Sequence, residues 1–109
     1  MKFYISMVLI METIKKDKNT VLIKLDGDFD SITSLDIEPK FMDAITDAKN
    51  VTVDLTDLDY ITSAGLRVLL CAQKQLRNNG GNMIVTNPNS EVMAVFKVTG
   101  FTRLLNIAG

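Results

Sequence analysis

The chain has 109 residues, of which 47% are hydrophobic and 23% are charged, and this composition suits one globular domain with its own core. The formal net charge of −1 gives no general attraction to nucleic acid or to an anionic membrane surface. Because the sequence holds no histidine, a His-based catalytic triad, a phosphohistidine relay and a His-ligated metal site are excluded. We therefore do not expect an enzyme of an ordinary kind.

Cys71 is the single cysteine, so the chain cannot form an internal disulfide. This cysteine usage favours a reducing compartment and predicts a cytoplasmic protein. Arg67 and Lys74 are only weak activators of the thiol, so we expect Cys71 to pack as a small apolar residue.

The first eleven residues are largely apolar after Lys2 and resemble a weak secretory signal. No small-residue cleavage site follows, and charged Glu12, Lys15 and Lys16 come directly after the run. The run is also too short to span a membrane. We predict the first strand here, with residues 1–7 as an N-terminal extension of it, and no membrane insertion.

Residues 21–25 form a β-branched run that predicts a strand, and residues 26–28 after it carry a turn signal. The polar pair at 18–19 predicts a hairpin back to a strand around residues 8–14. A first helix is expected within residues 34–48.

Pro39 fits the first turn of a helix and not its interior, so the regular part of this first helix should start near Glu38. Apolar residues at spacings of three and four then predict its buried stripe. The stripe consists of Phe41, Ala44, Ile45 and Ala48.

Residues 51–55 are nearly all apolar or β-branched, which predicts a strand buried on both faces. A helix with apolar spacing follows from near Ser63 to Leu76, and Gly80 and Gly81 end it. Residues 82–86 predict a third core strand.

Ser90 is predicted to cap the last helix, and Gly100 should stop it. Residues 104–107 are expected to add a short final strand. The apolar residues of this helix are Val92, Val95, Phe96 and Val98.

Strands separated by single helices predict right-handed crossovers in a single α/β domain that spans residues 1–109. The sheet should be mixed, mostly parallel, with four to five strands and with helices packed against it. The carboxyl ends of its parallel strands then meet at one rim, where open α/β sheets usually meet ligands and partners. We expect Asp28, Asp30, residues 57–63 and residues 87–90 to be neighbours there.

Aspartates cluster after two of the strands and suggest a magnesium site, because Mg²⁺ binds carboxylates at strand ends. They are Asp26, Asp28, Asp30, Asp54, Asp57 and Asp59. No phosphate-binding glycine loop accompanies them, and aspartate is common in turns. A response-regulator receiver is disfavoured, since Asp54 lies inside its strand and the later lysine pattern is not evident. We predict no metal and no cofactor.

Ser63 lies where a helix begins after a buried strand. The unpaired backbone N–H groups and the positive end of the helix dipole at such a position favour a phosphate. A partner protein could also touch the hydroxyl there. The plainer alternative is that Ser63 only caps the helix, since serine is a preferred N-cap residue.

Three segments resemble the STAS family, which comprises bacterial anti-sigma factor antagonists and the cytoplasmic tails of sulphate transporters. They are residues 25–30, residues 51–55 and the motif Tyr-Ile-Thr-Ser-Ala-Gly-Leu at 60–66. The likeness runs from about Val8 to Ile107. It implies a STAS fold and a phosphoacceptor at Ser63.

In the antagonists the acceptor serine follows an acidic residue and precedes a small residue and a glycine. Ala64 and Gly65 match the later positions, whereas Thr62 stands at the acidic one and is a candidate second acceptor. Asp30 matches the family's acidic residue near the phosphosite, and Asp28 lies two residues before it.

The resemblance implies partner switching without catalysis. The unphosphorylated protein would bind an ATP-dependent anti-sigma factor serine kinase and free a sigma factor, phosphorylation would release it, and a serine phosphatase would reset it. The alternative is a structural STAS subunit of a lipid-transport ABC complex or of a scaffold assembly. A homodimer is left open.

Three side chains around the serine carry separate hypotheses. Arg67, one turn beyond Ser63, is expected either to hold the phosphate or to be a solvated surface residue. Gly65 either leaves room for the kinase or lets the helix start pack tightly. Asp30 is expected to serve the partner with little effect on the fold.

Overall fold

The computed structural model describes residues 8–108, so the predicted extension at residues 1–7 lies outside the described part of the chain. None of the helices in the described range is long and apolar enough to cross a membrane. The elements in chain order are β1 (Leu9–Lys15), β2 (Thr20–Phe29), α1 (Thr33–Ala44), β3 (Asn50–Ile61), α2 (Ser63–Asn78), β4 (Asn82–Thr86), α3 (Ser90–Thr99), a short 3-10 turn at Phe101–Arg103 and β5 (Asn106–Ala108).

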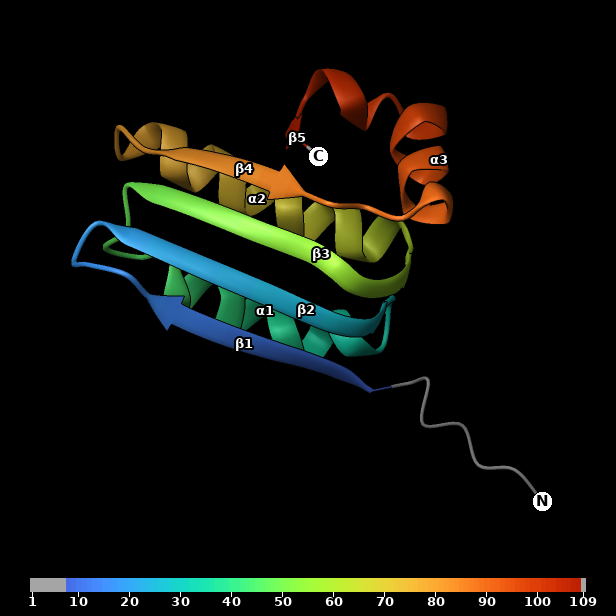
Figure 1. Cartoon of the computed structure of the whole chain (residues 1–109), viewed down its shortest axis with the longest axis horizontal. Coiled ribbons are helices and arrows are strands. Elements are labelled where there is room, and N and C mark those ends of the chain that lie inside the picture. Colours follow the sequence, from blue (N-terminus) through green and yellow to red (C-terminus); the bar gives the residue numbers. More distant parts are fainter. Residues whose placement is uncertain (1–7, 109) are drawn as a thin grey trace.

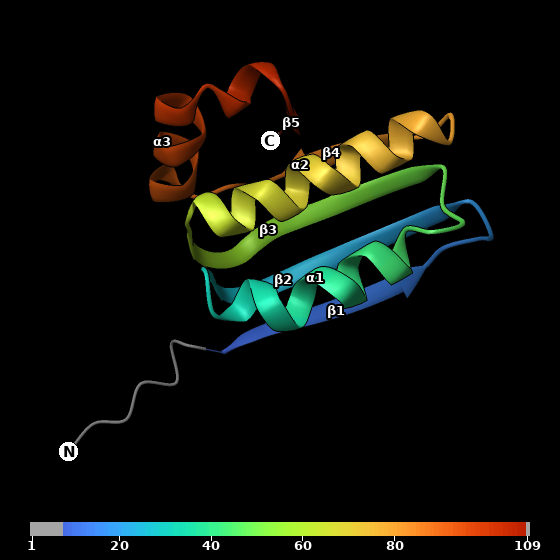
Figure 2. The same ribbon diagram turned by 180° about the vertical axis from the view of Figure 1, so that it is seen from behind.

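The five strands form one sheet in the order β1-β2-β3-β4-β5. β1 pairs antiparallel with β2, and every later pair is parallel. Figures 1 and 2 show α1 and α2 side by side on one face of this sheet, with α3 beyond the carboxyl end of β4. The predicted sheet, mixed and mostly parallel with helices packed against it, is confirmed.

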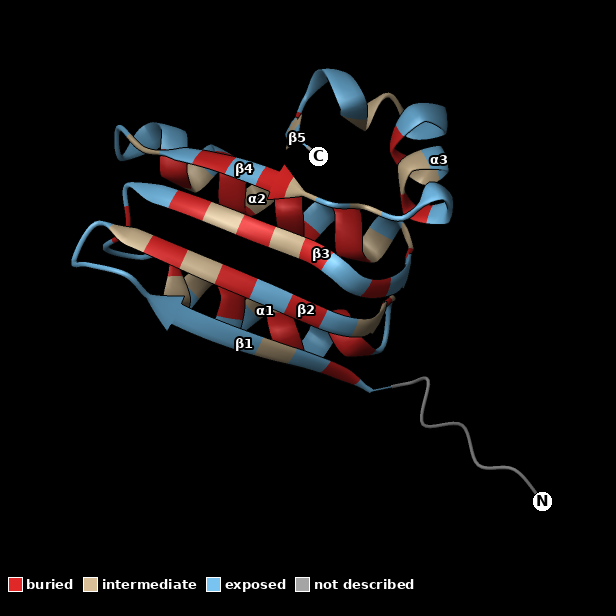
Figure 3. Ribbon diagram, viewed as in Figure 1, coloured by how far each residue is buried: buried red, intermediate tan, exposed pale blue. Residues whose placement is uncertain are grey.

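The core lies between the sheet and the two helices that cover it. Val51, Val53 and Leu55 of β3 are buried, whereas Thr52 and Asp54 between them are only half-buried. Figure 3 shows the same alternation along β2 and β4. The prediction that residues 51–55 are buried on both faces is therefore wrong, because α1 and α2 leave the other face of the sheet uncovered.

The turn predicted at residues 26–28 is also wrong, because β2 continues through it to Phe29 and β3 continues beside it to Ile61. Two register shifts between these strands, one on each side of Asp26-Gly27, absorb the irregular stretch as bulges. Gly27 adopts φ 121° there, and a Cβ on it would lie 2.3 Å from the Val8 carbonyl oxygen. Glycine is required at this point by both the backbone angle and the close approach of β1.

Helix α1 starts at Thr33, well before Glu38, and Pro39 lies in its interior, contrary to the prediction. Pro39 lacks the N–H that would bond to the carbonyl of Leu35. Both residues are exposed, so water can satisfy that carbonyl and the proline is tolerated. The helix also ends at Ala44, so buried Ile45 and Ala48 follow it instead of completing its stripe.

The second half of the chain follows the predicted elements closely, and α2, β4 and the stop at Gly100 are confirmed. The cap of α3 is Asn89 and not Ser90, since its side chain accepts the Val92 N–H at 2.8 Å. Val98 is 87% exposed and does not belong to the buried stripe of that helix.

Candidate functional site

The carboxyl ends of β2, β3 and β4 meet at one rim of the sheet, as predicted. The amide of Asn89, at the end of the β4–α3 connection, donates hydrogen bonds to the carbonyls of Leu58 at 3.0 Å and Asp59 at 3.3 Å in β3. Asp28 of β2 lies close enough to Asp59 and Asp30 for their charges to affect it. Side chains from three separate parts of the chain therefore share this rim.

Ser63 is the first residue of α2, and its side chain is exposed. Thr62, with extended backbone (φ −109°, ψ 179°), occupies the N-cap position instead, and no side-chain cap hydrogen bond is present. The alternative that Ser63 only caps the helix is therefore wrong. Among residues 8–108 the Ser63 hydroxyl has no hydrogen-bond partner, and Ala64 after it is half-buried.

Thr62 is held in place through its backbone. Its N–H donates to the Phe29 carbonyl at 3.0 Å, and its own carbonyl accepts the Leu66 N–H at 3.0 Å. The Thr62 hydroxyl is buried and has no partner among the described residues. A protein kinase could not reach this oxygen unless the start of α2 opened, which argues against Thr62 as a second acceptor.

Gly65 sets how closely the start of α2 approaches the sheet. A Cβ at this position would lie 2.7 Å from the Phe29 carbonyl oxygen, 2.8 Å from the Phe29 ring and 2.9 Å from the Ile61 side chain. These atoms leave no space for even one methyl group. Of the two hypotheses for this glycine, the structure supports tight packing.

Asp30 has a structural task that the sequence did not indicate. Its Oδ1 accepts the N–H groups of Ile32 and Thr33, each at 2.9 Å, and the Thr33 hydroxyl at 3.2 Å. These bonds fix the first turn of α1, so the expectation that Asp30 could be replaced with little loss of fold is wrong.

Asp28 is the aspartate of this rim whose environment disfavours ionisation. Burial raises the pKa of its carboxyl above the ordinary value, and the negative charges of Asp59 and Asp30 raise it further. The described residues contain no group of three ligands arranged to hold a metal ion. The clustered aspartates thus make this rim negative, and their mutual repulsion disfavours any further negative charge there.

Asp54 belongs to a different surface, the uncovered face of the sheet. Burial opposes ionisation there, but hydrogen bonds from Thr56 and Asn87 prevail and lower the pKa of its carboxyl. The Thr56 hydroxyl donates at 2.6 Å and the Asn87 amide at 3.2 Å. Asp54 therefore accepts hydrogen bonds from the local residue Thr56 and from Asn87, and it is separate from the aspartates of the rim.

Arg67 has a partner that sequence analysis missed. Its guanidinium donates two hydrogen bonds to Glu38 of α1, Nη1 to Oε2 at 3.0 Å and Nη2 to Oε1 at 2.7 Å. The hydrogen bond from Arg67 lowers the pKa of the Glu38 carboxyl. Glu38 lies 29 residues earlier on another helix, and only the packing of α1 against α2 brings the two together.

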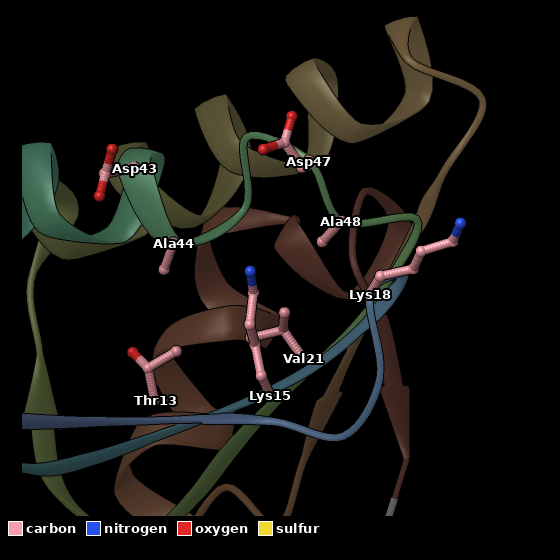
Figure 4. Close-up of a pocket in the computed structure, with 8 residues that line it drawn as sticks. All are labelled: Thr13, Lys15, Lys18, Val21, Asp43, Ala44, Asp47 and Ala48. Atoms are coloured by element: carbon pink, nitrogen blue, oxygen red, sulfur yellow. The ribbon is translucent and has the colours of Figure 1, made fainter.

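A hollow of about 340 Å³ lies at the opposite end of the sheet, between the β1–β2 hairpin and the end of α1 (Figure 4). Lys15 and Lys18 line it on the hairpin side, and Asp43 of α1 and Asp47 after that helix line it on the other side. The two charges of each sign balance, so the lining selects no ionic class of ligand. It is remote from Ser63 and adds nothing to the rim.

Comparison with known proteins identifies the family of this chain. The model of the STAS domain family matches residues 12–108. A 60-residue segment is 42% identical to a candidate anti-sigma factor antagonist, BtrV, of Bordetella bronchiseptica, and covers 55% of this chain and 52% of that protein. The anti-sigma-B factor antagonist of Bacillus subtilis is 21% identical over 95 residues, which is 87% of each chain.

The fold is also that of a solved structure. The anti-sigma factor antagonist SpoIIAA in its unphosphorylated form superposes with a TM-score of 0.79 at 24% identity. The superposition covers 92% of this chain and 89% of SpoIIAA. This likeness confirms the predicted architecture of the sheet and helices.

Gly65→Ala should destabilise the protein by about 1–3 kcal/mol, because the new methyl group overpacks the contact of α2 with Phe29 and Ile61. Urea denaturation followed by circular dichroism measures this change. Ala94→Gly, at an exposed position in α3, is the control and should cost no more than about 1 kcal/mol. Unchanged or increased stability of Gly65→Ala would contradict the packing role.

Asp28→Asn should stabilise the protein at pH 7. The folded state binds the Asp28 proton more tightly than the unfolded state, so ionisation at neutral pH weakens folding, and stability falls as pH rises through the raised pKa. The advantage of the variant should vanish once the pH drops below the ordinary aspartate pKa of about 3.9. Urea denaturation at pH 7 and pH 3.5 tests this, and a less stable variant at pH 7 would refute it.

Proposed function

Because this chain belongs to the STAS domain family, we propose that it is an anti-sigma factor antagonist that works by partner switching. In its unphosphorylated form it binds an ATP-dependent anti-sigma factor serine kinase and so frees a sigma factor. The kinase phosphorylates Ser63 and releases the protein, and a serine phosphatase restores it. The chain itself has no catalytic task in this cycle.

The observation that carries the proposal is the contrast between two neighbouring hydroxyls at the start of α2. Ser63 is exposed and has no hydrogen-bond partner among the described residues, whereas the Thr62 hydroxyl is buried. The backbone around both is fixed by the bonds of Thr62 and by the packing of Gly65. Of these two hydroxyls, a kinase could therefore reach only that of Ser63, which lies on a backbone held in place by hydrogen bonds and packing.

The charge of the rim explains why phosphorylation would release a partner. A phosphate adds about −1.5 to −2 charge at neutral pH, and burying such a charge without a cation is costly. Asp28, Asp30 and Asp59 already make the neighbourhood negative. A partner surface that fits this rim in the unmodified state would face strong repulsion afterwards.

The partner surface that we propose extends from the rim onto both helices. Asp28 and Asp30 supply negative charge, and Arg67 lies one turn beyond Ser63. Ile32 and Leu35, at the start of α1, are 53% and 77% exposed and offer apolar contact. Such a mixture of exposed apolar side chains with charges at the margin suits a protein interface.

Ser63→Ala should keep the stability within about 0.5 kcal/mol, since the hydroxyl caps nothing. It should bind the kinase as the parent does and remain bound when ATP is added. Ser63→Asp should bind more weakly. Mass mapping of the parent after incubation with kinase and ATP checks the site, and phosphate on another residue with Ser63 unmodified would overturn the assignment. Binding to a permease without any phosphorylation would favour the structural-subunit alternative.

Asp30→Asn separates the two tasks of Asp30. The amide oxygen can still accept the N–H groups at the start of α1, so stability should be kept, whereas Asp30→Ala should lose about 0.5–2 kcal/mol. If the negative charge serves the partner, Asp30→Asn should weaken kinase binding and slow phosphorylation. Asp47→Asn removes the same charge at the opposite end of the sheet and is the control. Equal kinase binding by Asp30→Asn and the parent would exclude a role for the charge.

A further inference from the structure

The ion pair of Arg67 with Glu38 links the two helices that cover the sheet. Within residues 8–108 it is the one ion pair between α1 and α2, since the other pair, Lys40 with Asp36, lies inside α1. Its side chains are accessible, 56% for Arg67 and 30% for Glu38. Exposed pairs of this kind exchange partners readily when a stronger one is offered, because water screens both charges.

A phosphate on Ser63 would be such a stronger partner. Residues four apart on a helix lie on the same face, and an anion placed N-terminal to its cation is the favoured arrangement. The phosphate carries up to two negative charges and accepts a bidentate arginine, whereas Glu38 carries one charge. The first turn of α2 has no acidic side chain to compete for the arginine.

We propose that phosphorylation of Ser63 moves Arg67 from Glu38 to the phosphate and leaves the Glu38 carboxylate unpaired on α1. The exchange replaces two hydrogen bonds between helices with two hydrogen bonds within α2. It rests on the proposed function only in taking Ser63 as the modified residue.

The exchange would change the charge on α1, at a distance from the phosphate itself. Arg67 then covers part of the new negative charge, and Glu38, on α1, is uncovered in exchange. Leu35, one turn before Glu38, is 77% exposed, and Ile32 beside it is 53% exposed. A partner that rests on this apolar end of α1 would meet a free carboxylate at its margin and would sense phosphorylation without touching Ser63.

The test uses protein with phosphoserine incorporated at position 63 during translation, so that no kinase is needed. The phosphate of each variant is titrated by ³¹P NMR, starting from the ordinary second pKa of about 6. Arg67→Gln should raise the phosphate pKa, so that the phosphate binds its proton at least about threefold more tightly than in the parent. Glu38→Gln should lower it, because the competing carboxylate is gone.

Lys74→Gln, eleven residues beyond Ser63 on the same helix, removes an equal charge and should leave the phosphate pKa unchanged. The aspartates of the rim, Asp28, Asp30 and Asp59, raise the phosphate pKa equally in all these variants, so differences between variants isolate Arg67. Amide spectra of the variants confirm that each is folded.

Carbon-13 titration of the Glu38 carboxyl gives a second and direct readout. Its pKa is lowered in the unmodified protein and should return toward the ordinary glutamate value when Ser63 carries phosphate. An Arg67→Gln protein with the same phosphate pKa as the parent would overturn the exchange, as would a Glu38 pKa that phosphate does not alter. Neither result bears on partner release, which is measured separately with the kinase.

Discussion

The continued pairing of β2 with β3 beyond their bulges determines where the candidate site lies. Both strands run past their bulges until Phe29 faces Ile61, and the next hydrogen bond is that of the Thr62 N–H with the Phe29 carbonyl. α2 starts immediately after this bond. The direction of its first turn therefore depends on two strand ends that are joined to each other.

Gly65 makes this junction possible from the side of the helix. The backbone oxygen and ring atoms of Phe29 fill the space that any larger residue would need, so the backbone of the first turn of α2 packs directly on the strand ends. The cost is a glycine in the first turn of a helix, where it adds flexibility to the unfolded chain. The packing of this contact offsets that cost, and Ser63 is presented from a support that cannot easily yield.

Much of this architecture could be predicted from the sequence, because its strands and helices alternate with clear periods. Residues 82–86 and the bounds of α2 needed no more than local patterns. Those patterns failed where tertiary contacts decide the local structure. The stretch 26–28 looks like a turn until β1 and β3 pair with it, and Pro39 looks like a helix start until Asp30 fixes an earlier one.

The candidate serine was also predictable, since it lies in a short motif at the join of a strand and a helix. Its surroundings were less so. The pairing of Arg67 with Glu38 depends on how two helices pack, and no pattern in either segment contains that information. The burial of the Thr62 hydroxyl could not be predicted from the sequence either, because threonine is mostly exposed in folded proteins.

That burial has a consequence for the proposed phosphorylation. In an unfolded chain Thr62 and Ser63 are adjacent hydroxyls with the same access to solvent, and only the folded junction makes them differ. Local opening of the first turn of α2 would expose the threonine for as long as the opening lasts. Any phosphothreonine at position 62 would thus record the fraction of molecules that were open at this corner, and the ratio of the two phosphorylated residues would serve as an internal gauge of how firmly the corner is closed.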